Sequence, residues 1–410
     1  MRIRGERLKD WGNVPVMAPT GAIQLGSLMV WLPIMALILR DLGASDVVIS
    51  LAVATWTASE AVAQFVGGKF ADEWGRRPIL VVSSFSAAIF LLLGAFTGHW
   101  VTFTLLFVLM RFAKGFQTPA RTMIIGESVR PDLQGRAFGV VEMFIASLAV
   151  LGPVLGAYLI GWIPAQRLLL VTAGGWGVAA FFRYRYLQET LKPNAERIRF
   201  SFRQLFRGSL FEVLLTLVAV NTIFNLTLWG PFMALHASDV FLLSREQINL
   251  FYAIGSGFGA ASSPLVGRLV DHFGAARFLG VNLLLFGLAA FTWSFQGTVF
   301  GIILGYVAMG ITYQVAMIGS AAYRIAMTDP QTRGAGLGAC GMISIMIAAL
   351  VVPIVGYLRV LWGSHLPFVV VAVLGLAVAL RLLLKPQIPD WLAVVEDQQP
   401  PDADLSFPDQ

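Results

Sequence analysis

The chain has 410 residues, of which 57% are hydrophobic and 13% are charged, with a formal net charge of +6. Soluble domains carry roughly 25% charged residues, so this composition excludes a soluble enzyme or a nucleic-acid-binding module as the main body of the protein. The only cysteine is Cys340 and the four histidines share no ligand spacing, so we expect no disulfide framework, no metal and no cofactor. The composition is that of a chain whose solvent is mostly lipid.

Twelve apolar runs of membrane-spanning length follow one another along the chain. A helix crosses the hydrocarbon core in about 20 apolar residues. The runs are continuous, which excludes a β-barrel, whose strands alternate in polarity over about ten residues. The sequence therefore predicts an all-α membrane protein with twelve transmembrane helices. Their approximate centres are Leu28, Thr57, Ala88, Lys114, Ser147, Gly175, Thr222, Gly257, Leu285, Thr312, Ile345 and Ala372.

The distribution of Lys and Arg predicts the orientation of these spans. Of the 29 basic residues, 22 fall in the connections that we assign to the inside, Arg183 among them, and three fall within span four. Only four fall in the outside connections, and these are Arg40, Arg167, Arg245 and Arg359. Because cytoplasmic connections carry the excess of bases, both termini are predicted to be cytoplasmic, in a cell inner (plasma) membrane.

The longest inside connection divides the chain into two halves. We expect a six-helix bundle at 1–183, a basic cytoplasmic linker at 184–208 and a second six-helix bundle at 209–385. The remaining segment, 386–410, holds six acidic residues and no Lys or Arg. Its acidic, Pro-rich composition predicts a disordered cytoplasmic tail.

The two halves repeat each other in sequence. Asp72 and Asp271 stand at equivalent places in two similar segments, an offset of 199, and three further matches have offsets of 198 to 200. These matches pair Trp31-Leu-Pro33 with Trp229-Gly-Pro231, Gly135 and Gly139 with Gly334 and Gly338, and Pro153-x-x-Gly156 with Pro353-x-x-Gly356. One register over five spans indicates duplication of a six-span unit. Two such pseudo-symmetric bundles are typical of a secondary transporter.

Three motifs resemble the major facilitator superfamily, most closely its twelve-span drug:proton antiporter group. The segment from Gly68 to Pro78 resembles the signature loop of that family between spans two and three. Arg111-x-x-x-Gly115 resembles its span-four motif, and Gly152-Pro153-x-x-Gly156 resembles its span-five antiporter motif, with Ala157 and Leu148 as departures. The loop-motif residues are Gly68, Asp72, Gly75, Arg76 and Arg77, and the second copy retains Gly267, Asp271, Gly274 and Arg277.

The resemblance implies a role for the loop motif and for the span-five motif. In the family the loop cluster, here with Glu127 and Arg136 as further members, latches the cytoplasmic side in the outward-open state. The alternative is that it marks topology and stabilises the loop. The span-five pattern goes with antiport in the family, whereas its glycines and proline also suit close helix packing or a bend.

Span four carries three bases where the membrane makes charge costly. At roughly 100° per residue, Arg111, Lys114 and Arg121 share one face, and the acids that balance them are Glu60 in span two and Glu142 in span five. Three interpretations stay open: a proton-coupling pair of Arg111 with Glu60 or Glu142, a basic stripe that binds an anionic substrate group, or ion pairs that only fix helix packing.

The second half offers polar and aromatic residues in place of these charges. Substrate contact and ordinary interhelical hydrogen bonding are equally good interpretations of the polar residues, whereas aromatic residues in such spans more often pack or anchor the helix at the interface. With Gln24 of span one, the residues of both kinds are Asn221, Asn225, Trp229, Tyr313 and Gln314.

These features predict a secondary active transporter that works by alternating access. We expect proton-coupled antiport that exports amphipathic small molecules. The alternative is transport of an organic anion or acidic lipid on the basic face of span four. No nucleotide-binding loop is present, no dyad of an intramembrane enzyme is visible, and the internal duplication favours a monomeric transporter over a channel.

Overall fold

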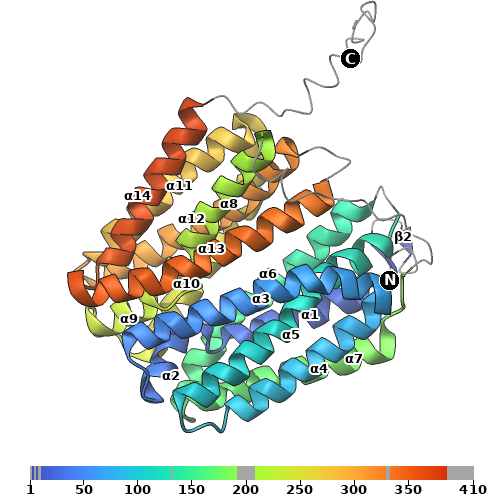
Figure 1. The fold of residues 1–410 in the computed structure, drawn as a ribbon, viewed down its shortest axis with the longest axis horizontal. Helices are drawn as coiled ribbons and strands as arrows, with labels where there is room; N and C mark the ends of the chain where they lie inside the picture. Colours follow the sequence, from blue (N-terminus) through green and yellow to red (C-terminus); the bar gives the residue numbers. More distant parts are fainter. Residues whose placement is uncertain are drawn as a thin grey trace, which may run out of the picture.

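The computed structural model describes residues 2–3, 6–7, 11–130, 133–191, 208–328 and 333–385. In this part of the chain the helices form two groups, one from each half of the sequence (Figure 1). The predicted acidic tail and most of the predicted linker lie outside the described residues.

The first group contains six long helices and several short elements. Its long helices are α1 (Val14–Met29), α3 (Asp46–Trp74), α4 (Arg76–Gly94), α5 (Trp100–Glu127), α6 (Gln134–Ile160) and α7 (Leu169–Tyr186). Its short helices are η2 (Leu32–Ile34), α2 (Met35–Asp41) and η4 (Ala165–Leu168). Two two-residue strands, β1 (Arg2–Ile3) and β2 (Glu6–Arg7), pair antiparallel before α1.

The second group repeats this order. Its helices are α8 (Gly208–Leu226), α9 (Phe232–Asp239), α10 (Arg245–Phe273), α11 (Ala275–Ser294), α12 (Val299–Met327), α13 (Arg333–Trp362) and α14 (Leu366–Leu384). In the described part of the chain, α7 ends at Tyr186 and α8 begins at Gly208.

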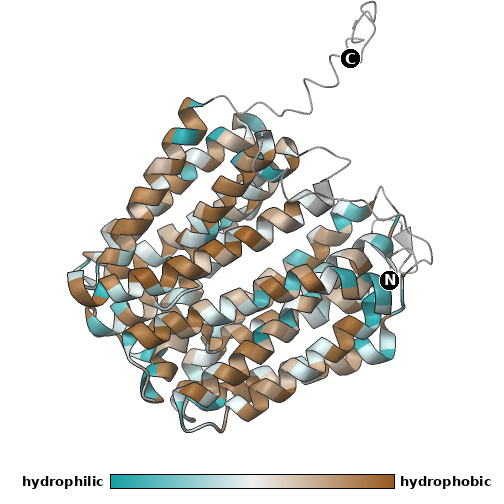
Figure 2. Cartoon of the chain, viewed as in Figure 1, coloured by the Kyte–Doolittle hydropathy of each residue, from teal (hydrophilic) through white to brown (hydrophobic). Residues whose placement is uncertain are grey.

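Ten stretches of the described chain are long and apolar enough to cross a membrane. They coincide with ten of the twelve predicted spans; the other two correspond to α5 and α10, whose polar residues lower their hydropathy. Apolar side chains such as Phe85, Leu92 and Val373 are exposed on the outer helices, where Figure 2 is mostly brown. Only lipid lets so many apolar side chains remain on the surface, so the chain is an integral membrane protein.

The sequence repeat appears as repeated local structure. The first copy of the Trp-x-Pro segment separates α1 from α2, and the second separates α8 from α9, because proline and the residue before it disfavour a continuous helix. Gly75 between α3 and α4 and Gly274 between α10 and α11 both take positive φ, 100° and 81°. A side chain at either position would be strained, which explains why both copies keep glycine.

The two groups meet mainly along two long interfaces and two short ones. The long interfaces join α3 to α13 and α6 to α10, and the short ones join α2 to α9 and η2 to α10. The offset of 199 carries α3 onto α10 and α6 onto α13, so the two long interfaces are equivalent under the repeat. We call the end of the molecule at α2 and α9 the pairing end, and the opposite end, where α7 stops and α8 starts, the linker end (Figure 1). One buried apolar cluster, which includes Trp31, Leu235 and Trp293, spans both groups.

Glycines let the helices approach closely at these contacts. A Cβ added to Gly156 of α6 would lie 1.9 Å from the carbonyl oxygen of Val30, and one added to Gly152 would lie 2.2 Å from that of Gly26. In the second half, a Cβ on Gly356 would lie 2.1 Å from Ser50 Oγ of α3. Gly152, Pro153 and Gly156 are all buried, with Pro153 inside α6. Close packing of α6 on α1 is therefore one role of this motif.

Candidate transport cavity

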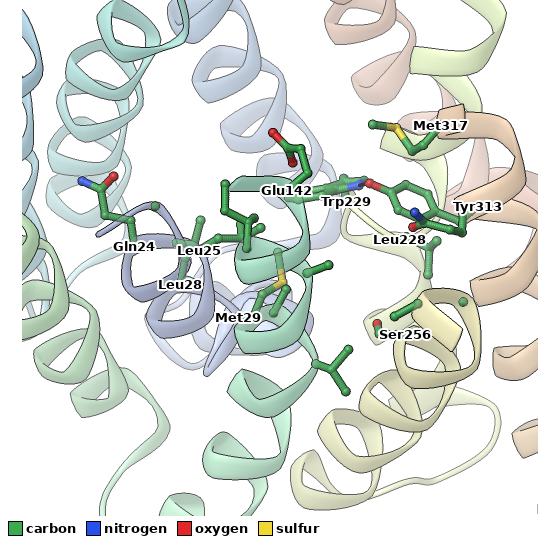
Figure 3. A pocket seen from close by; sticks show the side chains of 18 of the residues that line it. Gln24, Leu25, Leu28, Met29, Glu142, Leu228, Trp229, Ser256, Tyr313 and Met317 are labelled. Atoms are coloured by element: carbon green, nitrogen blue, oxygen red, sulfur yellow. Dashed lines mark hydrogen bonds between the residues drawn. The ribbon is translucent and has the colours of Figure 1, made fainter. Parts of the chain in front are cut away.

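A cavity of about 410 Å³ lies between the two groups of helices. The first half contributes residues of α1, α5, α6 and α7 to its wall, and the second half contributes α10, α12 and the connection after α8. Figure 3 shows Gln24 and Met29 on one side, Tyr313 and Met317 on the other, and Glu142 between them. The volume is that of a site for a small organic molecule.

The wall from the first half carries the charges. Lys114 and Arg121 of α5, Glu142 of α6 and Arg183 of α7 line it, together with Gln24 of α1. Arg121 Nη2 lies 3.4 Å from Glu142 Oε1, and both side chains are partly exposed. Membrane-spanning helices tolerate these charged side chains because the side chains face a cavity and one another instead of lipid.

The wall from the second half is aromatic. Trp229, Tyr252, Tyr306 and Tyr313 line it, and Trp229 Nε1 donates a hydrogen bond of 3.1 Å to Tyr313 Oη. Gln314 lines the same wall. The cavity therefore has one charged side and one apolar, aromatic side.

Glu60 of α3 lies behind the charged wall with two bases of span four. Its Oε2 is 2.9 Å from Arg111 Nε, and its Oε1 is 2.6 Å from Lys114 Nζ. The Glu60 side chain is 10% exposed. One buried carboxylate is thus shared by two bases, and Lys114 connects this ion cluster to the cavity.

Not every predicted site residue lines the cavity. Arg111 borders a separate small void next to Trp56 and Trp229. Asn221 donates to Ser344 Oγ at 2.9 Å, and Asn225 donates to the carbonyl of Asn221, so both make hydrogen bonds within the second half. Of the predicted pathway residues, those that line the cavity are Lys114, Arg121, Glu142, Gln24, Trp229, Tyr313 and Gln314.

Arg183 is a cavity residue that the sequence interpretation missed. The distribution of Lys and Arg in the sequence assigns Arg183 to the inside connection after span six. The structure places it within α7, where the residue is 1% exposed. Its Nε donates to Thr20 Oγ1 at 3.1 Å, and its Nη1 donates to Ser84 Oγ and to Gln117 Oε1, both at 2.9 Å. One feature of the sequence indicates that Arg183 belongs to the span: it lies about one helical turn before Tyr186, the last aromatic residue of that span.

Ion pairs join the two halves at the pairing end. Arg40 of α2 contacts Asp239 of α9 through Nη1 at 2.6 Å. Arg359 of α13 lies 2.9 Å from the same Asp239 and also pairs with Asp46 of α3. Arg359 is 5% exposed, whereas the side chains of Arg40, Asp46 and Asp239 are 26–34% exposed, so this network is only partly shielded from solvent.

A further pair, Arg245 Nη2 to Asp41 Oδ1 at 2.6 Å, lies at the rim of the same end. Three of the four bases that the sequence assigns to the outside, Arg40, Arg245 and Arg359, therefore pair across the halves. The sequence interpretation treated them only as markers of orientation.

The loop motif forms a cluster at the linker end. Arg76 Nη2 lies 3.1 Å from both Asp72 Oδ1 and Glu127 Oε1, and Nη1 donates to the carbonyl of Ala71. Arg77 donates instead to the carbonyl of Tyr184 at 2.7 Å. All these partners of Arg76 and Arg77 belong to the first half.

Glu189, just after α7, completes this cluster. It accepts hydrogen bonds from the backbone N–H groups of Arg76, Arg77, Thr190 and Leu191, at 2.9–3.0 Å. Partial burial raises the pKa of this carboxyl, but the four N–H donors outweigh that effect and hold the pKa below its usual value.

The remaining residues of the loop motif and of its second copy make fewer described contacts. A Cβ on Gly75 would lie 2.5 Å from Glu189 Oε2, whereas Gly68 has only ordinary contacts. Arg136 lies in the first turn of α6, and Arg277 is exposed near the start of α11. Gly267 and Asp271 fall in α10, with side-chain surroundings outside the described part.

Comparison with known proteins places these features in a family. The family model of the Major Facilitator Superfamily matches residues 17–238 and 215–403. The chain belongs to the major facilitator superfamily. The resemblance seen in the motifs is thereby confirmed, and the chain is a membrane transporter of this superfamily, not an enzyme. Among the described residues, no group of three or more His, Cys, Asp or Glu side chains is arranged to hold a metal ion.

The individual relatives are distant. An uncharacterised transporter of this superfamily from Bacillus subtilis, YybF, is 25% identical over 65% of this chain and 71% of its own length. The multidrug resistance efflux pump PmrA of Streptococcus pneumoniae is 23% identical over 62% of this chain and 66% of its own. The solved structure of a bacterial homologue of the lysosomal transporter Spinster, inward-facing and occupied, covers 95% of this chain and 98% of that one with a TM-score of 0.75 at 15% identity.

Proposed function

We propose that this protein is a secondary active transporter with twelve transmembrane helices in two pseudo-symmetric bundles, which expose the central cavity to one side of the membrane at a time. The observation that carries the proposal is the cavity itself. It lies between the halves, and ion pairs of Arg40 and Arg359 with Asp239 join the halves at the pairing end. A cavity at the interface of two repeats is where such transporters bind substrate.

The orientation follows from the positive-inside rule. With both termini in the cytoplasm, the linker end faces the cytoplasm and the ion-paired end faces outward. With this orientation, the ion pairs of the pairing end close the cavity toward the outside. The sequence relatives of bacterial type support a plasma-membrane location.

The cluster around Glu60 supports proton coupling. Glu60 is the shared partner of Arg111 and Lys114, and it is buried next to the cavity. Protonation of Glu60 would leave both bases without their counter-ion, so the protonated cluster favours a different arrangement of α3 and α5. Such a cluster couples a proton to the movement of the bundles.

Efflux of amphipathic small molecules by proton antiport is the transport mode we propose. Several relatives are named as multidrug efflux pumps, PmrA among them, and the mixed polar and aromatic wall suits an amphipathic ligand. Because the two repeats of one chain supply both walls of the cavity, the proposed transport does not require a second copy of the chain.

Flux in proteoliposomes with an imposed pH gradient tests this function. Cationic, neutral and anionic amphiphiles are offered in parallel, and the wild-type protein is expected to drive at least one of them against its concentration gradient. Glu60→Gln removes the titratable group and is expected to abolish the gradient-driven component while exchange without a gradient partly survives.

Glu142→Gln is the matched control. Glu142 also pairs with a span-four base, but its side chain is 57% exposed, and we expect a smaller effect on coupling. If Glu60→Gln keeps the wild-type dependence on pH, Glu60 has no coupling role. Unitary currents in single-channel recordings would contradict a transporter altogether.

A further inference from the structure

Arg183 is a buried charge without a carboxylate partner. It is 1% exposed, and no Asp or Glu of the described chain lies within salt-bridge distance of it. All three groups that accept its hydrogen bonds are neutral, namely Thr20, Ser84 and Gln117. A buried guanidinium normally has an anion beside it, because burial without a counter-ion is costly.

We propose that Arg183 and Gln117 form an anion-binding subsite, and that the substrate is an amphipathic organic anion with a carboxylate, sulfonate or phosphate group. This inference rests on the proposed function and narrows its substrate class. It gives the positive charge of Arg183 the partner that the described part of the chain does not supply.

The geometry leaves two donors for such an anion. The Nε and Nη1 of Arg183 are occupied by Thr20, Ser84 and Gln117, whereas no hydrogen bond is described for Nη2. Gln117 presents Oε1 to the guanidinium, so its Nε2 faces elsewhere, and this Nε2 is buried without a partner. Gln117 is 7% exposed, and both residues line the cavity. Two fixed N–H donors and a full charge are a recognition site for an oxyanion.

The charge balance of the site agrees with this assignment. The cavity wall carries three bases, Lys114, Arg121 and Arg183, but only one acid, Glu142. Glu60 behind the wall is already shared between Lys114 and Arg111. The described site thus has more positive than negative charge even when both acids are ionised.

The opposite wall accommodates the rest of such a molecule. Tyr252, Tyr306, Tyr313 and Trp229 offer an aromatic surface across the same cavity, and no acidic side chain of the second half lines it. A cation would meet only Glu142, which is already paired with Arg121. An anionic head at Arg183 with an apolar body on the aromatic wall uses both sides.

Three fluorescent probes with one body test the sign of the ligand. Dansylglycine carries a carboxylate, dansylglycinamide is its neutral analogue, and dansylcholamine carries a quaternary ammonium. Binding to the full-length protein in nanodiscs is followed by the rise in dansyl fluorescence. We expect dansylglycine to bind at least about tenfold more tightly than the amide, the effect of one hydrogen bond to a charged group, and the ammonium probe to bind most weakly.

Two variants locate the subsite. Arg183→Gln is expected to remove the preference for dansylglycine over its amide. Gln117→Glu supplies a carboxylate next to the guanidinium; it is expected to suppress dansylglycine binding while thermal stability stays at or above that of the wild type. The second variant keeps the test decisive if Arg183→Gln does not fold. Arg245→Gln, at the exposed rim of the pairing end, is the control and should keep the preference.

Two competitors identify the source of the anion. Displacement by 1-naphthoate indicates a free organic acid, and displacement by dihexanoyl phosphatidate alone indicates an acidic lipid headgroup; either supports an anion site. Equal affinity of the wild type for dansylglycine and its amide would overturn the inference, as would an unchanged preference in Arg183→Gln. Active transport of the ammonium probe without any anion preference refutes this inference and leaves the proposed function standing. Anion preference in binding without gradient-driven flux of any probe refutes the proposed function alone.

Discussion

Single glycines control how closely α6 packs on its neighbours. Gly156 has no room for a Cβ, whereas Gly139 in the same helix has nothing within 4 Å of the position where its Cβ would be. We therefore expect Gly156→Ala to lower the midpoint of thermal unfolding, because the methyl group would overlap the carbonyl of Val30 and push α6 away from α1.

Gly139→Ala is the matched control for this substitution. It adds the same methyl group at an open position of the same helix, so it is expected to leave the midpoint unchanged or to raise it, since alanine favours helix by up to about 1 kcal/mol. Equal effects of the two substitutions would mean that close packing is not the role of Gly156.

Some of the charged residues of the site could be predicted from sequence, and others could not. The helical spacing of Arg111, Lys114 and Arg121 predicted a common face, and Glu60 was among the acids proposed to balance it. Which acid meets which base depends on how α3, α5 and α6 cross, and a single sequence does not contain that geometry. Arg183 was missed because a base near the end of an apolar run has the same local pattern as a loop base.

At the scale of elements, the loop between α3 and α4 depends on Glu189 as much as on the motif residues. Because the pKa of Glu189 is held low, its carboxylate stabilises the folded loop at neutral pH, and this stabilisation is lost as the pH falls through the folded-state pKa. We expect Glu189→Gln to unfold at a lower temperature than wild type at pH 7, and the difference to shrink below about pH 4.

Thermal unfolding of both proteins across this pH range is the measurement. Glu73→Gln is the control, because Glu73, in the last turn of α3, forms an ion pair with Lys69 alone among the described residues, at 3.9 Å and with both side chains exposed; its effect should be small at every pH. A difference between wild type and Glu189→Gln that grows on acidification would contradict the assignment.

The ion pairs of α2, α9 and α13 are expected to hold the pairing end closed. Asp239→Asn removes the partner shared by Arg40 and Arg359, and should shift the population toward states open at that end. The readout is the labelling rate of a cysteine at the cavity residue Ser256 by an impermeant maleimide, with Cys340 replaced by serine. We expect the rate from the outer side to increase several-fold.

Asp41→Asn provides the comparison for this element. It breaks only the rim pair with Arg245, in which both side chains are at least 34% exposed. Such exposed pairs contribute little, so labelling of Ser256→Cys should barely change. An equal increase in both variants would show that the ion pairs of Asp239 are not what closes this end.

The order of the elements was easier to predict than their contacts. Twelve apolar runs and the offset of 199 follow from composition and repetition, which are local properties of the chain. The two runs that fall short of membrane-spanning hydropathy, α5 and α10, both line the cavity. Low hydropathy in a span is thus informative here, because polar residues are tolerated where a helix faces a cavity.

At the scale of the whole molecule, equivalent elements of the two halves attract each other through residues that are not themselves equivalent. In the register of the Trp-x-Pro segments, an offset of 198, Asp41 of α2 is equivalent to Asp239 of α9. Arg40, the residue before Asp41, contacts Asp239 at 2.6 Å. A base of α2 thus pairs with the acid of α9, so the equivalent elements α2 and α9 attract each other across the interface. The sequence showed the repeat, but not that these two positions meet.

In the proposed transport cycle the two halves move against each other around the cavity. Distances between spin labels placed at both ends of the molecule follow this movement. One pair, Ser45→Cys with Leu242→Cys, reports on the pairing end; the other, Lys69→Cys with Arg268→Cys, reports on the linker end, each with Cys340 replaced by serine. All four positions are exposed. Between acidic and neutral pH, and with or without dansylglycine, we predict that one distance lengthens as the other shortens. Two distances that stay constant during transport, or that change in the same direction, would contradict the account.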